Sequence, residues 1–147
     1  MRSERFVRAS TCLLSILLLA TVASFAKDGR DFAGYYSVGN VTQQGEKVQL
    51  TLNLQVFNYS DADVKQAVIK LHESGAGLAV HGSFQPIKLL ANQRDVKIRQ
   101  QFLVPAHEYE RWQNGTKPSL FIVYQDAAGH HWEHSIELSR RPAPFPF

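Results

Sequence analysis

Hydrophobic and polar residues alternate along much of the chain, which is the pattern of β-strands with one buried and one exposed face. The clearest run extends from residue 48 to residue 56, where Val and Leu occupy the even positions and Gln, Thr and Asn the odd ones. A second run lies at 96–104, and only Gln100 interrupts its apolar face. Both segments are therefore predicted to be half-buried strands.

Weaker alternation extends this pattern to seven strands, separated by clusters of Gly, Asn and Asp that are typical of turns. The predicted strands are 35–42, 48–57, 64–73, 78–90, 96–104, 118–125 and 131–139. Pro86 is a candidate break in the fourth strand. Residues 105–112 predict a short helix, because a Pro opens the segment and Asn114-Gly115 ends it. The fold class that follows is all-β, an antiparallel β-sandwich of seven strands with one helical turn between the fifth and sixth.

Residues Tyr35 to Arg141 resemble an immunoglobulin-like or fibronectin-like β-sandwich of an exported bacterial-type protein. The resemblance rests on the seven short strands, the helical turn before the sixth strand and the Gly-containing turn between the last two. It concerns architecture only. It implies two antiparallel sheets packed face to face, and it names no ligand.

The first 26 residues have the three regions of a secretory signal peptide. Three arginines begin the segment, an apolar stretch follows, and Ser24-Phe25-Ala26 provides a cleavage site. We therefore expect export to the periplasm or the cell exterior, with a β-sandwich domain at 27–141 and a Pro/Phe tail at 142–147. The alternative is an uncleaved anchor, although the uncharged run is short and polar for a membrane span.

Removal of this segment changes the charge of the chain. The 147 residues include 16 Lys plus Arg and 13 Asp plus Glu, a formal net charge of +3, and the first 26 hold three of the Arg and one Glu. The remainder carries about +1, so nucleic acid is not an expected partner, and no membrane insertion is expected after cleavage. Because Cys12 is the only cysteine, the domain is expected to be stable without disulfides.

Several acidic side chains fall in predicted loops. If the strands alternate in direction, the second-third, fourth-fifth and sixth-seventh connections lie at the same end of the sandwich. These loops contain Asp61, Asp63, Asn92, Asp95 and Asp126. Carboxylates from three loops suit a Ca²⁺ ion, but the spacing matches no calcium-binding loop. The same residue types are common in turns, where their side chains bind backbone amides.

The loops and the tail are the candidate contacts for a partner. In the loops, the candidates are Tyr59, Asp61, Asp63 and Asp126. In the tail, alternating Pro favours an extended conformation that presents Phe145 and Phe147. We therefore predict an exported, non-catalytic binding or structural module that presents loops or a strand edge to a protein or glycan.

Histidines provide an alternative, a metal-binding protein. His72 and His81 would face each other across a hairpin, and His130 and His134 would share one face of the last strand. Two imidazoles make an incomplete zinc site. Solvated strand histidines are the simpler interpretation.

No reactive constellation is visible in the sequence. There is no Gly-x-Ser-x-Gly motif and no Gly-rich phosphate loop. Glu108 and Glu110 flank Tyr109 on the predicted helix and are expected on its solvated face. The sequence therefore predicts that the protein is not an enzyme and needs no cofactor.

Overall fold

The computed structural model describes residues 31–75, 79–92 and 94–141. The predicted signal peptide at 1–26 and the Pro/Phe tail at 142–147 lie outside the described residues. Within the described part, no helix has the length and apolar character that crossing a membrane requires.

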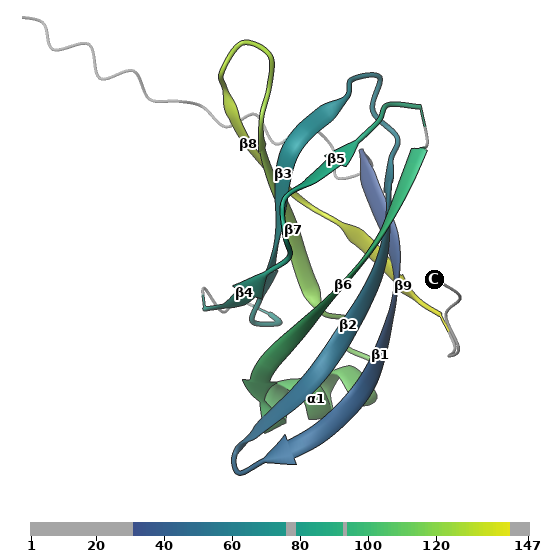
Figure 1. The fold of residues 1–147 in the computed structure, drawn as a ribbon. Coiled ribbons are helices and arrows are strands. Elements are labelled where there is room, and N and C mark those ends of the chain that lie inside the picture. Colours follow the sequence, from purple (N-terminus) through teal and green to yellow (C-terminus); the bar gives the residue numbers. More distant parts are fainter. Residues whose placement is uncertain (1–30, 76–78, 93, 142–147) are drawn as a thin grey trace, which may run out of the picture.

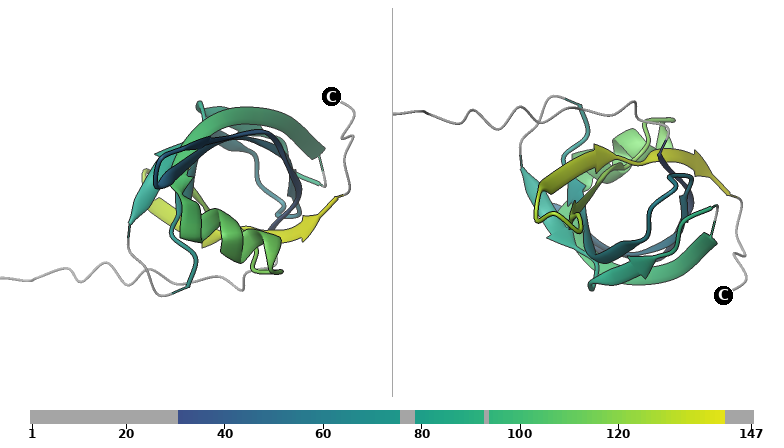
Figure 2. Two further views of the ribbon diagram at one scale, coloured as in Figure 1. Left: turned by 90° about the horizontal axis from the view of Figure 1, so that it is seen from below. Right: turned by 90° about the horizontal axis from the view of Figure 1, so that it is seen from above.

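Two β-sheets pack against each other, and viewed end-on they curve around a shared interior (Figure 2). One sheet has the order β6-β2-β1-β9, and the other has the order β4-β3-β7-β8, with β5 also paired to β3 (Figure 1). The strands are β1 (Phe32–Gln44), β2 (Lys47–Asn58), β3 (Val64–His72), β4 (Val80–Ser83), β5 (Ile87–Leu89), β6 (Arg94–Pro105), β7 (Ser119–Gln125), β8 (His131–Ser135) and β9 (Glu137–Arg140). The prediction of an all-β, two-sheet fold is confirmed.

The prediction of seven strands is wrong, because the described residues form nine. The predicted strand 78–90 is divided into β4 and β5, and the predicted strand 131–139 is divided into β8 and β9. In the second case the chain changes sheets, since β8 pairs with β7 and β9 pairs with β1. Such a strand forms a corner between two sheets.

The prediction that all strands run antiparallel is also wrong, because β9 lies parallel to β1, with Gly34 opposite Leu138. The direction follows from the corner. The chain passes from β8 to β9 through Ile136 alone and does not reverse. At this corner the N–H of Ile136 donates to the carbonyl of Leu120 at 2.9 Å. The β6-β2-β1-β9 sheet is therefore mixed.

The predicted helix is present as α1 (Ala106–Gln113), with Pro105 as its N-cap residue. However, the expectation that Glu108 lies on a solvated face is wrong, because this side chain is fully buried. Its Oε1 accepts hydrogen bonds from the backbone N–H of Ser74 at 2.7 Å and from the indole Nε1 of Trp112 at 3.1 Å. Glu108 therefore joins α1 to the segment that follows β3.

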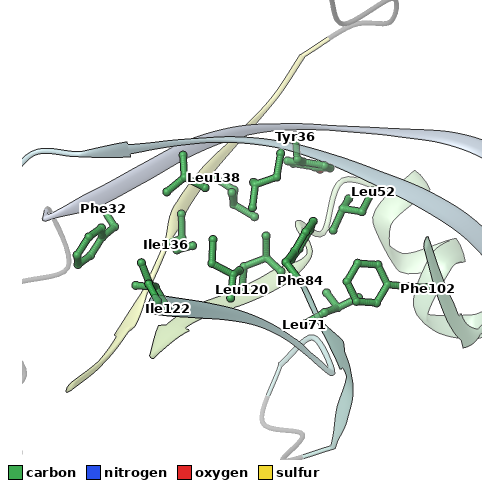
Figure 3. Packing of buried hydrophobic residues seen from close by; sticks show 14 of the residues in the cluster. Phe32, Tyr36, Leu52, Leu71, Phe84, Phe102, Leu120, Ile122, Ile136 and Leu138 are labelled. Atoms are coloured by element: carbon green, nitrogen blue, oxygen red, sulfur yellow. The ribbon is translucent and has the colours of Figure 1, made fainter. Parts of the chain in front are cut away.

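The core consists of the inward-facing residues of both sheets together with Trp112 of α1. The alternating residues of β2 from Val48 to Val56 are at most 2% exposed, as their pattern predicts. From the other sheet, Leu71, Leu120 and Ile122 face them (Figure 3). Burying this many large apolar side chains is the main source of stability for a domain without disulfides.

Candidate functional site

The three loops predicted to share one end of the sandwich do lie together (Figure 1). The backbone N–H of Ala91, after β5, donates to Oδ1 of Asp63 at 2.8 Å. The N–H of Asn92 donates to the carbonyl of Ser60 at 3.2 Å. Asp63 also lines a groove together with Asp126 of the turn between β7 and β8. The structure thus brings Asp63, Asn92 and Asp126 to one end, on three separate connections.

Asn58 organises the first of these loops, although the sequence did not indicate such a role. Its side chain is fully buried at the end of β2. Its Nδ2 donates to the carbonyl of Ala62 at 2.9 Å, and its Oδ1 accepts from the N–H and the hydroxyl of Ser60. These bonds replace the ladder partners that the chain loses where it leaves the sheet.

Asp126 organises the turn between β7 and β8. Its Oδ2 accepts from the indole Nε1 of Trp132 at 2.9 Å and lies 3.2 Å from Nδ1 of His130. Its Oδ1 accepts the N–H groups of Ala128 and His130, both at 2.9 Å. These hydrogen bonds, led by that of the indole, favour the ionised form and lower the pKa of Asp126 from 3.8 to about 2.

We expect the indole N–H of Trp132 to report this low pKa. Since the folded pKa lies below the ordinary value, the turn keeps its carboxylate contacts above pH 3.8 and loses them as the pH falls towards 2. In an NMR titration the Trp132 indole signal should shift with a midpoint near pH 2, and a Trp132→Phe variant assigns the signal. A midpoint near pH 4 would contradict the geometry of this turn.

A groove of about 840 Å³ runs along the outer face of the second sheet, beside these loops. Its floor includes Val68 of β3 and Val123 of β7, which are paired across the sheet. Lys65 and Lys70 of β3 line it as well. The complete lining is Ala62, Asp63, Lys65, Gln66, Val68, Lys70, Val123, Tyr124, Gln125, Asp126, Ala127 and His131. The groove therefore combines an apolar floor with two acidic and two basic side chains.

The sequence indicated only Asp63 and Asp126 of this lining. Most of the other lining residues lie on strands. Alternation predicts that such a residue faces outward, but it does not predict that a groove forms beside it. One signal was present, the consecutive polar residues Lys65 and Gln66 between the buried Val64 and Ala67. Two polar residues in a row break the period of two and mark a bulge, and the register of β3 with β5 does shift between Val64 and Ala67, where Gln66 has a φ of +50°.

The other predicted contact residues do not line this groove. Tyr59 is 47% exposed and stacks on Phe57, and Asp61 is exposed in the same loop. Asp95 lies at the start of β6, where it accepts a hydrogen bond from Nε2 of Gln55 at 2.7 Å. Phe145 and Phe147 lie outside the described residues.

The four candidate metal-binding histidines are divided between the two edges of one sheet. His72 on β3 lies opposite Val80 of β4 and not opposite His81, contrary to the prediction, whereas His134 lies on β8 at the other edge of the sheet and His130 immediately precedes β8. His134 is buried among the rings of Phe32, Tyr124 and Trp132. Within the described part of the chain, no three or more His, Cys, Asp or Glu side chains gather as a metal site would require.

Comparisons with known proteins identify no family for this chain. No protein-family model matches the sequence, and no curated protein matches it. Among solved structures, two chains of a GH20 exo β-N-acetylglucosaminidase from Vibrio harveyi are similar over 78% of this chain, with 12% identity and a TM-score of 0.42. A protein from Archaeoglobus fulgidus is similar over 67% of this chain and 94% of its own, with 11% identity and a TM-score of 0.31.

The present chain spans only 19% of the length of the Vibrio enzyme. Nevertheless, the presence of glycosidase chains among the neighbours contradicts the prediction that the protein is not an enzyme, and that prediction is withdrawn. A likeness of this strength carries no activity over to the present chain.

Proposed function

We propose that this protein is a binding module that holds a segment of a protein partner in the groove beside β3 and β7. The observation that supports this most directly is the composition of the groove, in which a valine floor lies among charged side chains. Protein interfaces commonly have such an apolar centre and polar rim. The sheet that forms the floor of the groove is also a rigid scaffold for the loops beside it.

The charges of the groove suit a peptide that carries both signs. Lys65 and Lys70 would attract an acidic side chain, whereas Asp63 and Asp126 at the loop end would attract a basic one. The low pKa of Asp126 keeps its charge present at any pH the protein is expected to meet. The groove is open to solvent, which suits an extended segment better than a small ligand that must be almost fully enclosed.

The test is selection of peptides from a random displayed library on the purified protein. Peptides enriched on the wild-type protein should lose about tenfold or more in affinity for Val123→Glu, which places a charge in the apolar floor. The matched control is Val41→Glu, since Val41 is 43% exposed near the tip of the hairpin of β1 and β2, in the other sheet. Equal binding to both variants would contradict the proposal, and so would the absence of any peptide that binds the wild type more tightly than 1 mM.

The immunoglobulin-like character and the export of the protein belong to the same proposal. Two packed sheets and a short helix before β7 support an immunoglobulin-like domain, although the parallel β9 departs from a purely antiparallel arrangement. Export rests on the signal-like segment at 1–26. An exported module of this kind would meet its partner in the periplasm or outside the cell.

A further inference from the structure

The outer face of the first sheet, away from the peptide groove, carries a second set of polar and aromatic side chains. At the loop end, the ring of Phe57 lies 6.0 Å from that of Tyr59, nearly parallel to it, and 5.9 Å from that of Tyr35. Arg141 stacks over Tyr35, with its guanidinium carbon 3.9 Å from the ring centre. This end of the face is therefore aromatic, and Tyr59 is half exposed.

Amide and hydroxyl side chains continue the face along β1 and β2. Asn53 donates through Nδ2 to the hydroxyl of Ser37 at 3.2 Å. Further along, Asn40 donates to the hydroxyl of Thr51 at 3.4 Å. Such groups offer both donors and acceptors, which is what the hydroxyl groups of a sugar need.

A pocket of about 420 Å³ lies on this part of the face. It is lined by Asn40, Thr51, Arg99, Gln100 and Gln101. Arg99 is the one charged residue in that lining, and no carboxylate accompanies it. A β-bulge between Gly39 and Thr42 shapes the pocket, and Asn40 there has a φ of +50°, which Asn tolerates better than most residues.

The strand register places the pocket and the rings along one line. Asn53 is opposite Arg99, and Phe57 is opposite Asp95, four residues further along both strands. At about 3.3 Å per residue, Arg99 lies roughly 13 Å from the ring of Phe57 along the sheet. This separation suits a short chain of sugars better than one sugar.

We propose that this face binds an acidic oligosaccharide, with a sugar carboxylate held by Arg99 in the pocket. Arg presents a planar fork of donors that fits a carboxylate, and the surrounding amides and hydroxyl can bind the sugar hydroxyls. The C–H face of a neighbouring sugar packs against the electron-rich face of Tyr59. A single-stranded nucleic acid needs rings along its path on which successive bases stack, whereas the described rings of this face lie only at its loop end, at Tyr35, Phe57 and Tyr59.

The experiment titrates the purified protein with hexagalacturonate and with its fully methyl-esterified form, at low ionic strength, by calorimetry and NMR. Hexagalacturonate should bind, and esterification should weaken binding about tenfold or more, because it removes the charge that Arg99 recognises. Arg99→Gln should weaken binding of the acidic form by a similar factor and leave the ester unaffected. Tyr59→Ala should weaken both forms.

The matched control is Lys88→Gln, which removes one exposed positive charge from β5 in the other sheet. Equal losses in Arg99→Gln and Lys88→Gln would show unspecific attraction and overturn the proposal. Equal affinity for the acidic and esterified forms, no binding of either form, or tighter binding of a single-stranded oligonucleotide would also overturn it. Unchanged melting temperatures establish that each variant is folded.

Discussion

Replacing Glu108 by alanine should lower the free energy of unfolding by about 3 kcal/mol, because it removes the acceptor of two buried hydrogen bonds and leaves one of the two donors unsatisfied. These donors are the backbone N–H of Ser74 and the indole N–H of Trp112, both of which bind Oε1 of Glu108. The indole keeps the hydroxyl of Ser74 at 3.0 Å as a second acceptor, whereas among the described residues the Ser74 N–H has Oε1 of Glu108 as its only acceptor. The loss should therefore be concentrated where α1 meets the end of β3.

Urea denaturation of Glu108→Ala and of a matched variant, Glu110→Ala, measures this effect. Glu110 is exposed on the same helix, so its removal should change the free energy of unfolding by no more than about 0.5 kcal/mol. Arg111 donates to the carbonyl of Ser74 at 2.8 Å in the wild type and can continue to do so in both variants. Equal stability of the two variants would show that the Glu108 contacts contribute nothing.

The pH dependence of the same cluster has a definite sign. Burial raises the pKa of Glu108, but the hydrogen bonds from Ser74 and Trp112 and the charge of Arg111 outweigh it and hold the pKa below the ordinary 4.5. The ionised form therefore stabilises the fold above pH 4.5, and this contribution is lost as the pH falls through the lower folded value. The stability advantage of the wild type over Glu108→Gln should be constant from pH 7 to about pH 5 and shrink below that.

Glu108 also shows where local sequence patterns stop being informative. The helix itself was predictable, because Pro105 and Asn114-Gly115 mark its two ends. Which face of the helix is buried depends on Ser74, 34 residues earlier in the chain, which supplies the donor for the carboxylate. A charged residue at such a position is expected on the surface unless the long-range partner is known.

The strands and the core were predictable to a greater extent than the site. Alternation is a property of each strand alone, so β2 and its buried face follow directly from the residues 48–56. Pairing is not local, and the parallel contact of β9 with β1 therefore has no signature in either segment. The peptide groove could not be predicted for the same reason, because its floor is formed by the pairing of Val68 with Val123, which are 55 positions apart in the sequence.

The division of the predicted strand 78–90 has a physical reason that concerns Phe84. Both Phe84 and Leu89 are buried, at 3% and 0% exposure. They are five positions apart, an odd number, and residues at odd spacing face opposite sides of a continuous strand. The chain must therefore break its extended conformation between them, and Pro86, which has no N–H for a ladder, lies at the break.

Phe84 should consequently be one of the most sensitive positions in the protein. Its ring packs edge-to-face on Phe102 of β6 at 5.2 Å, and its N–H donates to the carbonyl of Ile69 at 2.9 Å (Figure 3). It therefore joins the break between β4 and β5 to both sheets. Phe84→Ala should lower the free energy of unfolding by about 3 to 5 kcal/mol, the usual cost of removing a buried phenyl ring.

Denaturation and hydrogen exchange together distinguish this role of Phe84 from a general loss of apolar area. Val80→Ala is the matched control, since Val80 lies on β4 but is 52% exposed, and it should change the stability by no more than about 0.5 kcal/mol. If Phe84 fixes the break, the amides of β5 should lose protection in Phe84→Ala before those of β2 do. An equal loss of protection in β5 and β2 would contradict this role. It would mean that Phe84 stabilises the whole core to the same extent as any buried ring and does not fix the break between β4 and β5 in particular.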